Sequence, residues 1–270
     1  MQIEIIQAPS KEGDIDRNLE LALAHIRHCD AHTELAIFPE TFLTGFAEEG
    51  HIRDRALMRD GPEVAALIDA SRQHDIAIAI GMLEQEGDSV FNTTLFITPE
   101  SGLAWYYRKT HLWFSERALV DAGDRLVCGL WRGKRIGMLI CYDIEFPETA
   151  RALAAMGCDL IVVTNGNMDP YGPVHRYSAH ARAFENQLFF AMTNRCGEGA
   201  GCRFAGESAV IDPNGRLMGQ LGRGEGTLKV TLDFSLPPQI RRQYDYLRDR
   251  RLILPEKVEN QPDGQRWWLL

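Results

Sequence analysis

Short apolar runs that alternate with amphipathic segments limit the fold of this sequence more than any other feature. QIEIIQ at 2–7 and LAIFPE at 35–40 have the composition of buried strands. The segment 14–29 between them has mostly helical spacing of its apolar residues, and a second helix is predicted at 62–74 after a Gly-Pro start. Strands that alternate with helices indicate an α/β protein in which helices cover a sheet.

Neighbouring strands in the middle of the chain predict antiparallel pairing as well. VFNTTLFIT at 90–98 and GLAWYYRKTHL at 102–112 flank a turn around Pro99–Gly102 and read as a hairpin. RLVCGLW at 125–131 and RIGMLICYD at 135–143 follow an irregular segment. We therefore expect a layered α/β fold with mixed sheets and outer helices, and not a purely parallel sheet.

The second half repeats the alternation. Helices are predicted at 147–156 and 177–187, each followed by an apolar strand, DLIVVT and LFFAMTN. Two later strands are joined by a Pro-Asn-Gly turn at 213–215.

The domain organisation predicted from the sequence is simple. Since no low-complexity linker interrupts the chain, we expect one domain at 1–250 and a C-terminal tail at 251–270. The polar stretch from Ser235 onward is expected to lie as an arm on the surface or on a partner subunit.

Charge and apolar run length exclude several classes of function. The formal net charge is −9 and no basic block offsets it, which argues against nucleic-acid or anionic-membrane binding. No apolar run approaches the ~20 residues of a membrane span, and MQIEIIQAPSKEGD has neither a basic region nor a cleavable apolar segment. We expect a cytoplasmic protein with a small-molecule partner, in which the six scattered cysteines are reduced.

Three chemically reactive side chains follow three predicted strands. Glu40 closes LAIFPE, Lys109 follows LAWYYR, and Cys141 closes IGMLI. In layered α/β folds, sites collect at the carboxyl ends of strands, so these side chains can meet there. Glu40 would accept the thiol proton, and Lys109 would favour the thiolate and stabilise the oxyanion of a tetrahedral intermediate.

Carboxylates just after the cysteine raise a difficulty for this reading. Asp143, Glu145 and Glu148 would raise the pKa of Cys141 if they faced its sulfur. We expect them to point elsewhere, for example to cap the helix that begins near Pro147.

Each residue also has a simpler explanation. A cysteine in an apolar strand is typical of a core, and a Glu or Lys after a strand is typical of a solvated loop. His111 offers another chemistry, because positions two apart on a strand share a face and His111 could approach the site as the partner of Cys141.

Longer motifs around these positions resemble the nitrilase superfamily of carbon–nitrogen hydrolases, which use a Glu-Lys-Cys triad. The matching segments, in family order, are LAIFPETFLTGF, FNTTLFI, YYRKTHLWFSER, VDAGDR, GMLICYDIEFPE, ARAFENQLFFAMTNRCG and SAVIDPNG. The resemblance runs from about Ile3 to Arg251. It implies a four-layer α-β-β-α sandwich with mixed sheets that pairs into a larger dimeric sandwich, as a homodimer or higher homo-oligomer, with no metal or organic cofactor.

The resemblance also assigns roles. Glu40 would be the general base, Lys109 the stabiliser of the tetrahedral intermediate, and Cys141 the nucleophile that forms a thioester. Glu116 matches a second glutamate that orients the lysine, and the backbone N–H of Tyr142 would complete the oxyanion hole.

The branch within the family is predicted from the residues after Cys141. Nitrilases proper have Cys-Trp-Glu where this chain has Cys-Tyr-Asp, which favours amides over nitriles. Carbamoyl-amino-acid hydrolases have an arginine where this chain has Ile144 and Glu145. The segment is most similar to aliphatic amidases that act on amine-bearing amides such as 5-aminopentanamide, so Glu145 is a candidate for binding the cationic end of the substrate.

We therefore expect a thiol amidohydrolase that cleaves a small aliphatic amide, with ω-amino amides among the candidates. The alternatives are an N-carbamoyl hydrolase or acyltransferase of the same fold, and a non-catalytic oligomeric scaffold.

The loop after DLIVVT supplies the remaining candidates. In NGNMDPYGP, Asn165, Met168 and Tyr171 are predicted to line the substrate pocket. Arg182 and Glu185 are expected to form an ion pair on a helix.

Overall fold

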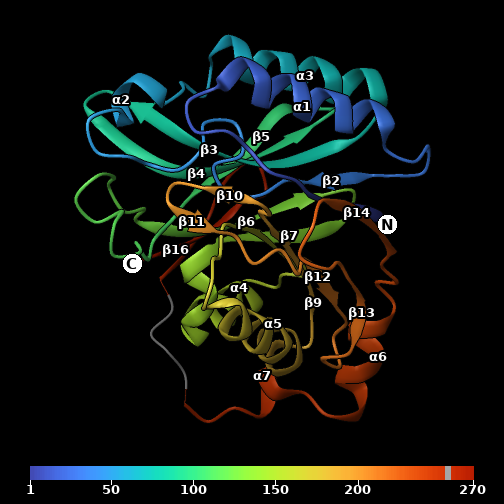
Figure 1. Ribbon diagram of the computed structural model, residues 1–270. Helices are drawn as coiled ribbons and strands as arrows, with labels where there is room; N and C mark the ends of the chain where they lie inside the picture. Colours follow the sequence, from blue (N-terminus) through green and yellow to red (C-terminus); the bar gives the residue numbers. More distant parts are fainter. Residues whose placement is uncertain (253–256) are drawn as a thin grey trace.

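The computed structural model describes residues 1–252 and 257–270. Two large sheets pack face to face, and helices cover both outer faces (Figure 1). Within the described residues the first sheet has the strand order β14-β1-β2-β3-β4-β5, and the second has the order β13-β12-β9-β8-β7-β6-β16-β15. Both sheets combine parallel and antiparallel pairs. The predicted four-layer α-β-β-α sandwich with mixed sheets is confirmed, and the dimer stays a prediction.

The strands of the first sheet are β1 (Gln2–Gln7), β2 (Leu35–Ile37), β3 (Ala77–Glu86), β4 (Ser89–Thr98), β5 (Gly102–Arg108) and β14 (Gly226–Thr231). Those of the second sheet are β6 (Arg125–Trp131), β7 (Lys134–Ile140), β8 (Leu160–Asn165), β9 (Phe189–Asn194), β12 (Ala209–Ile211), β13 (Leu217–Gln220), β15 (Val258–Asn260) and β16 (Arg266–Leu269). A small hairpin joins β10 (Glu198–Gly199) to β11 (Cys202–Arg203).

The helices are α1 (Ile15–His28), α2 (Ile52–Arg55), α3 (Pro62–His74), α4 (Pro147–Ala155), α5 (Gly172–Asn186), α6 (Leu236–Gln243) and α7 (Tyr246–Asp249). α1 and α3 cover the first sheet, and α4 and α5 cover the second (Figure 1). In the part of the chain that is described, no helix combines the length and apolar composition that a membrane span requires.

Alternating side chains along the strands of the first sheet build two separate cores. On β3, Ala77 and Ala79 face the second sheet, whereas Ile78, Ile80 and Met82 face α1 and α3. This follows from the two-residue period of a strand, which sends successive side chains to opposite faces. Because both faces are covered, the strand reads as a continuous apolar run.

Most predicted elements form, with one helix start misplaced. The hairpin at 90–112 and the helix at 62–74 are present. The helix predicted at 177–187 begins five residues earlier, at Gly172, because Pro173 lies in its first turn, where proline is favoured and its missing N–H costs nothing.

The C-terminal residues are part of the second sheet. β16 pairs antiparallel with β6, and Trp268 is buried against the core between the layers. Arg266–Leu269 therefore extends the sheet and does not lie as a polar arm, although α6 and α7, which follow Ser235, do lie on the surface. Residues 253–256 of the predicted tail lie outside the described residues.

Candidate active site

The three predicted reactive side chains converge between the two sheets. Glu40 follows β2, Lys109 follows β5 and Cys141 follows β7, and their residues are 0%, 1% and 8% exposed. Lys109 Nζ lies 2.7 Å from Glu40 Oε1, and Lys109 and Cys141 line the same pocket. Strand ends from both sheets therefore meet at one place, as expected from the topology.

Glu40 is positioned by a tight turn at the end of β2. Pro39 cannot donate a ladder hydrogen bond, and Thr41 adopts a φ of 46°, which is uncommon for a β-branched residue. The turn passes so close to β3 that a Cβ on Gly81 would lie 2.3 Å from Thr41 N and 2.8 Å from Glu40 Cα. Gly81 therefore provides the space that this turn occupies.

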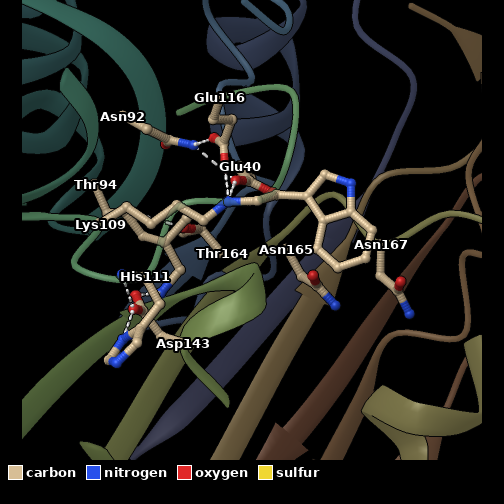
Figure 2. Close-up of polar contacts among 12 residues, drawn as sticks. Glu40, Asn92, Thr94, Lys109, His111, Glu116, Asp143, Thr164, Asn165 and Asn167 are labelled. Atoms are coloured by element: carbon tan, nitrogen blue, oxygen red, sulfur yellow. Dashed lines mark hydrogen bonds and ion pairs between the residues drawn. The ribbon is translucent and has the colours of Figure 1, made fainter. Parts of the chain in front are cut away.

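Lys109 is the centre of a buried cluster of charged and polar groups (Figure 2). Besides its contact with Glu40, Lys109 Nζ donates to Glu116 Oε2 at 2.6 Å. Asn92 Nδ2 donates to Glu40 Oε1 at 2.7 Å and to Glu116 Oε1 at 2.8 Å. The four side chains thus form a closed ring of hydrogen bonds in which one cation faces two carboxylates.

Cys141 lies at the start of the 3₁₀ turn η1 (Cys141–Glu145), which begins where β7 ends. Its φ is 44°, a region that non-glycine residues seldom occupy. The backbone N–H of Gly166, after β8, acts on Cys141 to lower the pKa of its thiol, although burial outweighs this effect. A Cβ on Gly166 would lie 2.2 Å from Phe46 Cζ and 2.7 Å from Glu40 Oε2. A glycine is therefore required where the chain passes so close to Phe46 and the Glu40 carboxylate.

Burial and the cluster set the protonation of these groups. Burial raises the pKa of the Cys141 thiol well above its ordinary value, and the charge of Glu40 adds to this, so the resting sulfur is a neutral thiol. Burial alone would lower the pKa of Lys109, but Glu116 and Glu40 outweigh it and raise this pKa well above the ordinary value. Burial also raises the pKa of Glu40. The lysine is thus firmly charged beside a thiol that needs a base.

Asp143, the carboxylate nearest to the cysteine in sequence, points away from the pocket and does not cap α4. Its oxygens accept hydrogen bonds at 2.8 to 3.0 Å from Tyr107 Oη, Thr110 Oγ1 and the backbone N–H groups of His111 and Ile140. Asp143 therefore ties the turn that carries Cys141 to the segment that carries Lys109.

His111 belongs to this structural network. Its Nδ1 lies 2.9 Å from Asp143 Oδ1, and its ring stacks on Phe146 with centroids 4.0 Å apart. In Figure 2 the imidazole lies with Asp143, apart from the cluster around Lys109. The geometry gives His111 a partner other than Cys141, which argues against the Cys–His alternative.

The thiol opens into a small pocket with aromatic walls. Trp113 is central, with ring centroids 5.0 Å from Tyr142 and 5.2 Å from Tyr171. Phe46 and Met168 complete the apolar lining. Tyr142, Met168 and Tyr171, which were predicted from the sequence, all lie in this wall.

A carboxylate outside the cluster also lines this pocket. Glu145 lines the pocket, and its Oε1 lies 3.1 Å from His175 Nε2. His175 Nδ1 lies 3.0 Å from Asn165 Nδ2, which can only donate, so Nε2 carries the proton and donates to Glu145. Burial lowers the pKa of His175 and keeps it neutral. Asn165 therefore lies behind His175, and Asn167 lines the pocket in its place.

Helix α5 holds the 3₁₀ turn η1, which carries Cys141 and Glu145. Arg182 and Glu185 form the predicted ion pair at 2.9 Å, and Arg182 Nε also donates to the carbonyl of Ile144 at 3.0 Å.

Sequence reasoning missed several residues of the site. Asn92, Gly81 and Gly166 contact the cluster or the thiol, and His175 contacts Glu145. The sequence did contain two signals. Asn92 is a polar residue within the strand FNTTLFI, and Gly81 is an isolated glycine within the strand IAIAIGM, which suggests close backbone approach.

Comparisons with known proteins agree with this geometry. The family model described as carbon-nitrogen hydrolase matches residues 2–242. An (R)-stereoselective amidase from Pseudomonas sp. is 47% identical over 100% of this chain and 98% of its own length. A superfamily protein from Xanthomonas campestris, solved with an arsenic adduct in its active site, superposes with a TM-score of 0.87 at 28% identity, covering 94% of this chain and 98% of that one.

A second solved structure bears on the cysteine. It is a Glu-to-Gln mutant of the amidase from Nesterenkonia sp. AN1 with the acetamide moiety of fluoroacetamide covalently added at its active-site cysteine. It has a TM-score of 0.84 at 29% identity and covers 93% of this chain and 94% of that one.

Proposed function

This chain belongs to the carbon–nitrogen hydrolase family, and from that premise we propose that it is a thiol amidase that converts small amides to a carboxylate and ammonia. The observation that carries the proposal is the cluster in which Lys109 Nζ contacts Glu40 and Glu116 beside a thiol that lines the same pocket. The 47% identity to an amidase over the whole chain supports the reaction class.

The first half of the reaction forms a thioester. Cys141 Sγ attacks the amide carbonyl carbon while Glu40 takes the thiol proton, and the carbonyl π electrons move to oxygen. An ammonium group has three N–H donors, and two of those on Lys109 already point to carboxylates, which leaves one for the oxyanion. The N–H of Tyr142 is the second expected donor. The C–N bond then breaks, and the leaving nitrogen takes the proton from Glu40 and departs as ammonia.

The second half hydrolyses the thioester. A water molecule gives a proton to Glu40 and adds to the thioester carbon, and the C–S bond breaks as the tetrahedral intermediate collapses. The carboxylic acid is released and loses its proton to solvent, and the proton on Glu40 returns to the sulfur. Glu116, held by Lys109 and Asn92, keeps the ammonium oriented through both halves.

The walls of the pocket favour an amide that carries an amine. Glu145 places a negative charge at the pocket, and Trp113, Tyr142 and Tyr171 present aromatic rings, which attract cations over their faces. We therefore place the substrate among small aliphatic amides with a cationic amine, which includes ω-amino amides. The amine would lie against Glu145 while the amide carbonyl lies at Cys141.

Ammonia release from a panel of amides tests both levels of the proposal. The panel contains ω-amino amides, neutral amides of the same length, both enantiomers of a chiral amino amide, carbamoyl amino acids and nitriles. Amide turnover that disappears in Cys141→Ala supports the reaction, and turnover confined to carbamoyl amino acids or nitriles contradicts it. Mass spectrometry of products formed with and without an added amine separates hydrolysis from acyl transfer.

Glu145→Gln tests the substrate class. This variant should lose about tenfold in kcat/KM for cationic amides and little for neutral ones, since a single charge contact with a partly exposed group has a modest value. Glu148→Gln is the matched control, because Glu148 lies three residues away on the exposed side of α4. Equal losses for cationic and neutral amides would contradict the assignment of Glu145.

A further inference from the structure

Asn92 contacts every charged member of the cluster although it carries no charge. Its Nδ2 donates one N–H to Glu40 and the other to Glu116, at 2.7 and 2.8 Å. Its backbone carbonyl accepts the N–H of Lys109 at 2.9 Å. Asn92 is 1% exposed and lies on β4, opposite the end of β5. The side-chain amide of Asn92 thus fixes two carboxylates, and its backbone carbonyl fixes the backbone of the lysine.

These contacts leave the two oxygens of Glu40 in different environments. Oε1 accepts from both Lys109 Nζ and Asn92 Nδ2. Oε2 is buried and has no hydrogen-bond partner among the residues that the structure describes. It lies on the side of Gly166, since a Cβ there would be 2.7 Å away, and both the N–H of Gly166 and the charge of Glu40 act on the Cys141 thiol. The unpartnered oxygen therefore lies toward the sulfur.

We propose that Asn92 is a positioning residue that holds the Glu40 carboxylate in one rotation, so that Oε2 is the atom that takes the thiol proton. This inference rests on the proposed amidase function and deepens it. In the step concerned, the S–H bond breaks, an O–H bond forms at Oε2, and a C–S bond forms to the substrate. Oε1 keeps both of its donors throughout, so the carboxyl group does not rotate as it changes charge.

The charges of the cluster explain why position 92 has a neutral amide side chain. Two carboxylates share one ammonium, so the ring has an excess negative charge in a buried place, where like charges repel strongly. Asn92 supplies two N–H donors and adds no charge. The titratable groups that face Glu40 are Lys109, Glu116 and Cys141, and the first two are held by the same amide or its backbone.

The test is the pH profile of kcat/KM for Asn92→Ala. Removing a donor from an ionised carboxylate raises its pKa, so the acidic limb of the profile should move upward by about one pH unit, with a loss of about tenfold or more in kcat. Asn92→Ser keeps a single donor and should give a smaller upward shift. This second variant keeps the test available if the alanine variant folds poorly.

Thr93→Val is the matched control. Thr93 is the next residue on β4, and its Oγ1 donates to another buried carboxylate, Glu84 Oε2, at 2.6 Å, outside the cluster. It should lose thermal stability as Asn92→Ala does while its acidic limb stays in place. An unmoved limb in both Asn92 variants, or an equal shift in Thr93→Val, would overturn the inference. In either case acylation of Cys141 in the unaltered enzyme would leave the amidase proposal intact.

Discussion

The two sheets contribute to the site in different ways. The first sheet supplies Glu40, Asn92 and Lys109, whose side chains, with Glu116, form a closed ring of hydrogen bonds. The second sheet supplies Cys141 on a turn with positive φ, beside the backbone of Gly166, whose N–H favours the charged form of the thiol. The charges are thus positioned by side-chain contacts, and the proposed nucleophile by backbone geometry.

This difference predicts how each half responds to change. Loss of a side chain in the ring leaves a buried charge without its partner, which affects stability and pH dependence together. Loss of backbone space at Gly166 displaces the chain beside the thiol and also crowds the Glu40 carboxylate, but it leaves the ion pairs of Lys109 with their partners. Asp143 connects the halves, because it binds Tyr107 and Thr110 from one and the N–H of Ile140 from the other.

The largest expected effect comes from removing the nucleophile. Cys141→Ala should lower kcat by at least about 10⁴-fold, as removal of a covalent nucleophile does in other hydrolases. Its thermal stability should change little, because the ring on the first sheet does not depend on the sulfur. Ammonia release measures kcat, and a thermal melt measures stability. A sharp fall in the melting temperature would contradict the claim that the charged ring on the first sheet is held independently of Cys141 on the second.

Lys109→Met should damage both activity and stability. It removes the proposed oxyanion donor, at an expected cost of about 10²–10³-fold or more in kcat. It also leaves Glu40 and Glu116 buried without their cation, which we expect to lower the free energy of unfolding by about 3–5 kcal/mol. Burial already raises the pKa of Glu40, so the stability loss should shrink at low pH, where Glu40 takes up a proton, and denaturant melts at pH 5 and pH 8 check this sign. Equal losses at the two pH values would contradict the assigned charges.

Asp143→Asn should uncouple the two halves. An amide in place of the carboxylate sets an NH₂ group against the surrounding donors, so we expect a loss of about 10²-fold in kcat from misplacement of Cys141 relative to Lys109. KM should change less than kcat, because the residue does not line the pocket. A change confined to KM would show that the coupling role is incorrect.

The smallest effects, which compare the two halves directly, are expected from two glycines. Gly166→Ala places a methyl group against Phe46 and the Glu40 carboxylate, and Gly81→Ala places one against the backbone of the Glu40 turn. Each should lower kcat by about 10-fold to 10²-fold. Gly166→Ala should slow alkylation of Cys141 by iodoacetamide, since it moves the backbone N–H of residue 166 away from the sulfur. Gly81→Ala should mainly shift the acidic limb of the pH profile of kcat/KM, since it displaces Glu40. Identical changes in both assays would remove the distinction drawn between the halves.

The sequence predicted the helices, the strands and the reactive residues better than it predicted the residues that position them. Glu40, Lys109 and Cys141 were predicted because each follows an apolar strand within a long family motif, and Glu116 because it matches the motif. Gly81 and Gly166 could not be assigned in this way, since their roles depend on contacts with the Glu40 turn and with Phe46.

Two structural features were also beyond local reasoning. The pairing of β16 with β6 joins residues about 140 positions apart, and its short, partly polar strand gives little signal. Asn165 was predicted to line the pocket because it begins the loop expected after DLIVVT, but its side chain points to His175, and Asn167 takes that place.

The central claim is that Cys141 carries the acyl group during turnover. An activated ester or anilide of a small amino acid, mixed with the enzyme and quenched in acid within milliseconds, makes acylation fast enough for the adduct to accumulate. We predict a mass increase equal to the acyl group on the peptide that contains Cys141, which decays as the carboxylate appears. Product formation at full rate with no adduct, or with the adduct on another residue, would contradict the account.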